Sequence, residues 1–139
     1  MYKKILIPVD GSAQSGKAVE QGVGLARQFG AQVVILHVVP PIPAIVDFEY
    51  TDDLKRKLAE QRRGMVADYQ RRHGGDKVDI KAEIVTGAAA EVICEKAEKE
   101  GFDLVVIGSR GTSPSQRILL GGVSERVSRN CHCPVLIVR

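Results

Sequence analysis

The chain has 139 residues, of which 44% are hydrophobic and 27% are charged. This length suits one domain, and the hydrophobic content supports a folded core, so an intrinsically disordered chain is excluded. The formal net charge is only +3, and the basic residues are interleaved with acidic ones and lack aromatic neighbours, so we expect no nucleic-acid partner.

The first strand is predicted over Lys4–Val9, a short apolar run bounded by charged residues. This run is too short for the hydrophobic region of a signal peptide. No stretch of the sequence approaches the ~18 apolar residues of a membrane span. We therefore expect a cytoplasmic protein with no membrane partner.

A helix is predicted from Ser12, a favourable N-cap, to Phe29, with Gly30 as its C-cap. Apolar residues recur along it every three to four positions and indicate a face that packs on a sheet. Gly22 and Gly24 each cost about 1 kcal/mol of helix propensity. Both are tolerable if the helix packs closely on its strand.

The second strand is predicted over Val33–Val39, where apolar residues follow one another without alternation. Continuous apolar strands are typical of parallel sheets that are buried on both faces. The Pro-rich segment 40–50 is also apolar, so we expect it to be covered by the domain itself, a ligand or a partner. A helix from Thr51 to His73 follows, and the alternating strand Val78–Val85 then suits a sheet edge with one solvated face.

The remaining elements are a helix over Ala88–Glu100, a strand over Leu104–Ile107, a helix near Val123–Arg129 and a last strand over Pro134–Val138. Alternating helices and apolar strands force parallel pairing with right-handed crossovers. The sequence thus predicts one domain over residues 1–139, with a three-layer α/β/α fold and a doubly wound, Rossmann-like sheet of parallel strands. In such sheets ligands bind beyond the carboxyl ends of the strands, where the winding reverses.

Cys94, Cys131 and Cys133 are the only cysteines, and their odd number does not suit a disulfide framework. We expect them to be partly buried, reduced thiols. His132 lies between two of them, but without a second cluster of ligands this run lacks the usual zinc spacing. No metal site formed by protein ligands alone is predicted.

The segment Gly108–Ser124 carries the strongest functional signal. It has glycines at both ends, hydroxyl residues between them and the start of a helix behind them. These features are typical of a phosphate-binding loop, because backbone N–H groups and the helix dipole favour an anion there. A Walker A loop is excluded because the segment has no lysine, and the first strand is not followed by a G-x-G-x-x-G fingerprint.

Four segments in order resemble the universal stress protein family: Ile5–Ser12, Leu36–Val38, Asp103–Gly111 and Pro134–Val138. The spacing Gly108-x2-Gly111-x9-Gly121 resembles the nucleotide loop of the ATP-binding branch of that family. The resemblance implies an adenine nucleotide alpha hydrolase-like fold that holds ATP, together with Mg2+, between the first and fourth strands. It also implies a homodimer through Val135–Val138. The alternative is that the segment 40–50 covers this last strand.

The resemblance also implies the nucleotide-binding residues, which are Pro8, Val9, Asp10, Val38, Gly108, Ser109, Arg110, Gly111, Gly121, Gly122, Val123 and Ser124. The first two would flank the adenosine, and Asp10 would accept from the ribose hydroxyls or assist a metal ion. Val38 would meet the adenine edge through its backbone, and Gly108 would approach the ribose. The residues from 109 to 111 would follow the phosphates. Those from 121 to 124 would offer them N–H groups and a hydroxyl.

Structural roles remain open for several of these residues. Asp10 alternatively caps the first helix, Val38 belongs to the core, and Ser109 and Arg110 orient the turn. At Gly122 the sequence departs from the family, which usually has Ser or Thr there. The missing hydroxyl would weaken phosphate binding by about 1.5–3 kcal/mol, unless Ser124 partly substitutes for it.

Three functions fit these observations: an ATP-binding regulatory protein of the stress response, a slow ATPase or nucleotide-dependent enzyme, and a nucleotide-free dimeric stress protein. Arg110 and Arg117 would stabilise a transferred phosphate, but neither His37 nor His73 falls beside the phosphates and no base for water is evident. We therefore assign no catalytic residue. The glycine spacing argues against the nucleotide-free branch and favours the regulatory protein, whose signalling partner the sequence does not identify.

Overall fold

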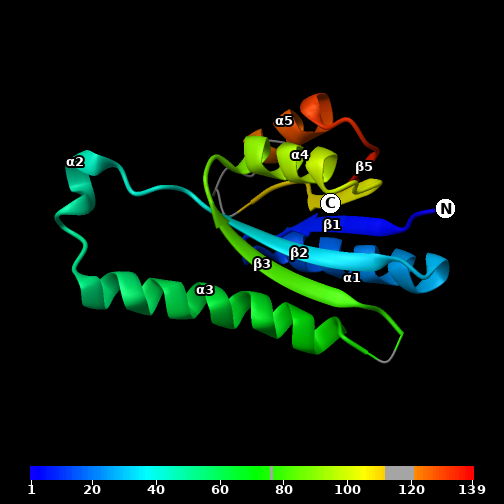
Figure 1. Cartoon of the computed structure of the whole chain (residues 1–139), viewed down its shortest axis with the longest axis horizontal. Helices are drawn as coiled ribbons and strands as arrows, with labels where there is room; N and C mark the ends of the chain where they lie inside the picture. Colours follow the sequence, from blue (N-terminus) through cyan, green and yellow to red (C-terminus); the bar gives the residue numbers. More distant parts are fainter. Residues whose placement is uncertain (76, 112–120) are drawn as a thin grey trace.

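The computed structural model describes residues 1–75, 77–111 and 121–139. Its strands form one parallel sheet in the order β3-β2-β1-β4-β5 (Figure 1). The strands are β1 (Lys4–Pro8), β2 (Gln32–Val39), β3 (Ile80–Thr86), β4 (Leu104–Gly108) and β5 (Val135–Val138). The predicted doubly wound α/β fold is therefore confirmed.

Helices cover both faces of this sheet (Figure 1). The described helices are α1 (Ala13–Phe29), α2 (Ala44–Asp47), α3 (Asp52–His73), α4 (Ala89–Lys99) and α5 (Gly122–Asn130), and all of them except α2 pack on the sheet. α1 and α3 pack on one face, while α4 and α5 pack on the other. Within the described ranges, no helix combines the length and the apolar character needed to cross a membrane.

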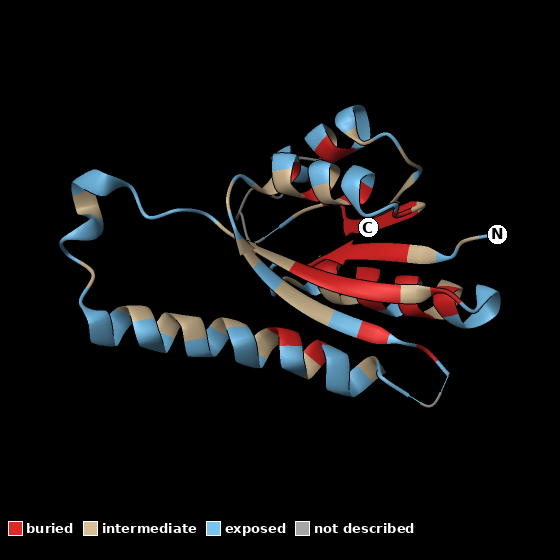
Figure 2. Cartoon of the chain, viewed as in Figure 1, coloured by how far each residue is buried: buried red, intermediate tan, exposed pale blue. Residues whose placement is uncertain are grey.

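The central strands are buried along most of their length (Figure 2), and their alternate residues pack into two separate cores. Ile5 and Ile7 of β1 point to the α1/α3 layer, whereas Leu6 points to the α4/α5 layer, and all three are fully buried. This arrangement follows from the two-residue period of a strand. It explains why the strand reads as a continuous apolar run.

Two sequence-based expectations need correction. The third strand begins at Ile80 rather than Val78, because the Val78 N–H turns back to the carbonyl of Gly75. The domain does not cover the apolar segment 40–50, where Ile45 is 81% and Phe48 is 82% exposed. This segment, which includes the unpredicted helix α2, projects from the body beside the start of α3 (Figure 1). It cannot cover β5, which lies at the opposite edge of the sheet from β3.

Close packing of α1 on β1 requires a glycine at position 22. A Cβ atom there would collide with the side chain of Ile7, whereas a Cβ at Gly24 would meet open space. We expect Gly22→Ala to lower the free energy of unfolding by about 1–2 kcal/mol, since overpacking outweighs the gain in helix propensity. The control Gly24→Ala should raise it by about 0.5–1 kcal/mol. Urea unfolding measures both, and equal effects of the two substitutions would contradict the packing argument.

Candidate functional site

A cleft of about 300 Å³ opens at the carboxyl ends of β1, β2 and β4. Its lining residues are Pro8, Val9, Asp10, Ser15, Leu36, Val38, Ala89, Ile93, Ile107, Gly108, Arg110, Gly111, Gly121, Gly122, Val123 and Ser124. Every binding residue expected from the sequence is in this lining except Ser109, which is buried beneath it. Residues 112–120, including Arg117, lie outside the described part of the chain.

Part of the apolar lining of the cleft was not expected from the sequence. Leu36, Ile107, Ala89 and Ile93 form the apolar part of the lining that was not expected to face the cleft. The last two lie one helical turn apart on α4, and this spacing also fits an ordinary core face. Their position beside the end of β2 could have been found only from the sheet order, because it depends on which helix covers that end.

The end of β1 is bonded to β2, and the Asp10 N–H that follows it donates to the Ser15 hydroxyl of α1 at 3.4 Å. The Val9 N–H donates to the carbonyl of Leu36 at 2.8 Å, and Nδ1 of His37 lies 2.8 Å from the Val9 carbonyl oxygen. Pro8 has no N–H, so it leaves no donor unpaired at the cleft wall. These contacts fix the backbone that carries Asp10 at the mouth of the cleft.

Asp10 is not the cap of α1. Ser12 is the N-cap and accepts from the Ser15 N–H at 3.1 Å, as the sequence predicts. Oδ1 of Asp10 accepts from the Ser12 N–H at 2.9 Å, which holds the turn in front of the helix. Its other carboxylate oxygen lies where a Cβ of Gly111 would be. Asp10 and Gly111 therefore meet across the mouth of the cleft.

Gly108 has a packing role as well as a place in the lining. A Cβ atom there would lie 2.8 Å from the backbone carbonyl carbon of Gln14, in the first turn of α1. The absence of a side chain therefore lets the helix approach the end of β4. The expected approach of a ribose at Gly108 is a separate requirement on the same residue.

The carbonyl of Ser109 joins the end of β4 to the start of α5. It accepts from the Gly121 N–H at 2.6 Å and from the Ser124 hydroxyl at 2.9 Å. Both serines are buried. In this arrangement the Gly121 N–H and the Ser124 hydroxyl are both used within the protein. Their expected contacts with phosphates, including a substitution of Ser124 for the hydroxyl missing at Gly122, stay predictions.

The first turn of α5 keeps the N–H groups of Gly122, Val123 and Ser124 at the cleft. Gly121 is the N-cap, and among the described residues no side chain caps this end. N–H groups in a first helical turn have no partner within the helix and carry the positive end of its dipole. Together with Arg110, they make this side of the cleft attractive to an anion.

The whole chain, residues 1–139, matches the model of the universal stress protein family. The chain belongs to this family. Universal stress protein MJ0531 of Methanocaldococcus jannaschii is 38% identical over all of the chain and 83% of its own length. Universal stress protein UspA from Lactobacillus plantarum superposes with a TM-score of 0.86 at 26% identity, covering 99% of this chain and 98% of that one. A universal stress protein solved in complex with cAMP has a TM-score of 0.69 at 27% identity, covering 99% and 97%.

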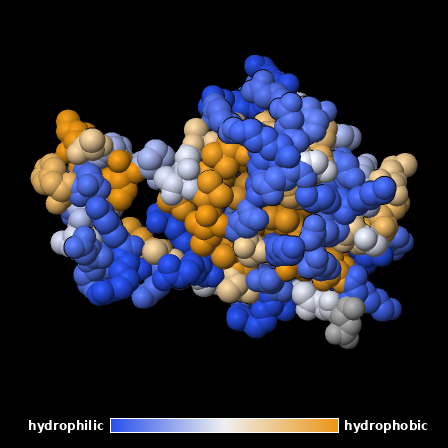
Figure 3. Space-filling model, viewed as in Figure 1, coloured by the Kyte–Doolittle hydropathy of each residue, from blue (hydrophilic) through white to orange (hydrophobic). Residues whose placement is uncertain are grey.

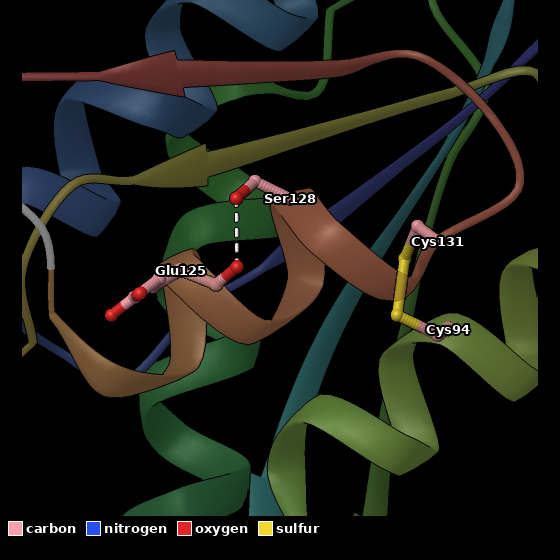
Figure 4. The surroundings of a disulfide bond; sticks show 4 residues. All are labelled: Cys94, Glu125, Ser128 and Cys131. Atoms are coloured by element: carbon pink, nitrogen blue, oxygen red, sulfur yellow. Dashed lines mark hydrogen bonds between the residues drawn. A yellow bond between two sulfur atoms is a disulfide. The ribbon is translucent and has the colours of Figure 1, made fainter.

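This family member carries a disulfide that the sequence reasoning excluded. Cys94 of α4 is bonded to Cys131, the residue that ends α5 (Figure 4). An odd cysteine count says nothing about one pair, and these two helices lie side by side on one face of the sheet. Cys133 is a free thiol, and burial raises its pKa. The last helix of the cleft is thus covalently tied to α4 at the end far from Gly122.

We expect the disulfide to stabilise the fold by about 3–4 kcal/mol, because it closes a loop with a sequence separation of 37. Reduction should lower the unfolding free energy of the native chain by this amount. It should have no effect on the double variant Cys94→Ser/Cys131→Ser. Cys133→Ser is the matched control and should behave like the native chain. Equal urea midpoints for the native chain with and without reductant would contradict the bond.

Proposed function

We propose that this universal stress protein binds ATP, together with Mg2+, and acts as a nucleotide-responsive regulator. The observation that carries the proposal is the division of the cleft into an apolar half and a half that attracts anions. A nucleotide has the same division between its base and its phosphates. The cAMP complex of a family relative supports an adenine nucleotide as the ligand class.

The apolar half suits a base. Leu36, Val38, Ile93 and Ile107 surround it, and adenine requires apolar contact on its faces with polar partners at its edge. Val38 lies near the end of β2, beyond Leu36, the last residue paired with β1, so that β3 alone pairs with it. We assign the base edge to the backbone near this residue.

The opposite half suits phosphates and a metal ion. The first turn of α5 and Arg110 would hold the phosphate oxygens. Asp10 supplies a carboxylate at the mouth, and Mg2+ is commonly held by one or two carboxylates together with the phosphates of a nucleotide. The residues present therefore fit a Mg2+-nucleotide and are not arranged as a metal cage of their own.

The contacts favour binding over turnover. Asp10 is the only carboxylate among the described residues that line the cleft. One of its oxygens already holds the turn at Ser12. The imidazole of His37 lies at hydrogen-bond distance from the Val9 carbonyl oxygen through Nδ1. A base that orients water is not evident in this set, so hydrolysis is not part of the proposed function.

The test is ATP binding measured by calorimetry with and without Mg2+. The native chain should show saturable binding and a rise in melting temperature. The proposal would be overturned if nucleotide-free protein showed neither heat of ATP binding nor a shift in melting temperature when ATP is added.

Asp10→Asn should weaken ATP binding in the presence of Mg2+ more than in its absence, because it removes the charge that faces the metal.

Gly122 allows a sharper test of the phosphate side. A Cβ there meets open space, so serine fits without displacement. We expect Gly122→Ser to tighten ATP binding about 10- to 100-fold, the equivalent of a new hydrogen bond to a charged group. Gly122→Ala is the matched control, because it stiffens the backbone equally but adds no hydroxyl. Equal affinities of the two variants would place the phosphates elsewhere.

We further propose that the chain forms a homodimer through the open edge of β5. Pro134 and Val138 accept from N–H groups on the β4 side, so the N–H groups of the alternate residues Val135 and Ile137 face outward.

Ile137→Pro removes one of these outward N–H donors, so this variant should no longer form the β5 dimer. Ile137→Ala loses the same side-chain packing but keeps the donor, and should remain dimeric. Sedimentation measures both, and a dimeric Ile137→Pro would contradict the β5 interface.

A further inference from the structure

A second hollow of the molecule lies between α3 and the edge strand β3. It has a volume of about 520 Å³. Small side chains, Ala59 and Ala67 of α3 and Ala82 of β3, leave this space open, and Val66 and Ile84 add apolar surface. Arg62 and Arg63 also line it. We call it the α3/β3 groove, and it is apolar with a basic rim.

The segment 40–50, which we call the arm, has the opposite character. Ile45 and Phe48 are both more than four-fifths exposed, and apolar side chains gather on the projecting arm (Figure 3). Glu49 lies next to them in the sequence. An exposed apolar tip of this kind marks an interaction site rather than an ordinary surface.

In this structure the arm does not fill the groove of its own chain, although Val39, the residue before the arm, lines that groove. Thr51 caps α3 at the foot of the arm by accepting from the Leu54 N–H at 3.1 Å. From Asp52 to Arg63 the helix is continuous, and it spans about 16 Å. Ile45 and Phe48 precede the start of this helix, and neither lines the groove. The exposed tip of the arm is therefore available to a second copy of the chain.

The charges of the arm and of the α3/β3 groove indicate which molecule fills the groove. Within the described residues, Arg62 and Arg63 form no ion pair, and neither does Glu49, whereas Asp47 of the arm is paired with Lys55 at 3.0 Å. An apolar arm with an acidic residue and an apolar groove with a basic rim thus occur on one chain. We propose that the arm of one copy docks in the α3/β3 groove of a second copy, and that the exchange is mutual.

In this interface Phe48 and Ile45 fill the space above the three alanines, and Glu49 meets Arg62 or Arg63 at the rim. The interface uses the β3 side of the molecule, whereas the dimer proposed above uses the β5 edge. It also contains none of the residues that line the nucleotide cleft. The proposed arm–groove interface can therefore be tested independently of ATP binding.

The test measures association by sedimentation in the Ile137→Pro background, where the β5 edge lacks the outward N–H donor of residue 137. The parent should still form a concentration-dependent dimer. Ile45→Ser/Phe48→Ser should weaken that dimer about tenfold or more. Because both side chains face solvent, the variant should keep the melting temperature of the monomer, which separates lost docking from unfolding. A parent that stays monomeric, or a double variant that associates as strongly as the parent, would overturn the proposal.

A charge swap tests the register of the contact. Glu49→Lys alone and Arg63→Glu alone should each weaken association, and the two together should restore most of it. Glu60→Lys is the matched control, because it makes the same charge change at an exposed site of α3 outside the groove and should leave association unchanged. An effect of Glu60→Lys as large as that of Glu49→Lys, or additive losses in the double swap, would refute docking in this groove.

Discussion

The site depends on the parallel pairing of β1 with β4 at the centre of the sheet. Leu6 lies opposite Val105, and beyond this pair the chain leaves the two strands toward opposite faces. α1 follows β1 into one layer, and α5 lies in the other. Neither helix can cover the ends of both strands, so the cleft is a consequence of the winding order. The topology of the sheet creates the cleft, and the side chains line it.

The polar groups around that space fall into two sets. One set holds the loop, because the Gly121 N–H and the Ser124 hydroxyl both donate to the Ser109 carbonyl. The other set remains directed at the cleft, namely the remaining N–H groups of the first turn of α5 and the side chain of Arg110. Because the first set is satisfied internally, the second is held in place before a ligand arrives. Such preorganisation lowers the entropy lost on binding.

The sheet could be predicted from sequence because four of its strands are short apolar runs between turn residues and the third, β3, alternates as an edge strand does. Once five such strands alternate with helices, the crossover rules leave little choice of architecture. The place of the site followed from the same rules, which is why the expected residues gather at one cleft.

The details that could not be predicted depend on distances between elements. The partner of the Ser124 hydroxyl is a carbonyl fifteen positions away, and nothing in the local sequence specifies it. Cys94 and Cys131 meet only because α4 and α5 are neighbours in one layer. α2 is a four-residue helix directly after Pro43, too short for any periodic pattern to show.

The positions of β3 and β5 at the two ends of the sheet have a consequence for how copies of the chain can assemble. A single self-complementary face joins two molecules and leaves no further site for a third. Two such faces allow each pair to bind further copies, and the assembly closes as a tetramer if the two two-fold axes intersect at a right angle and grows as an open row if they do not. The relative direction of the two axes, more than the strength of either interface, would then decide whether the protein stays small or polymerises.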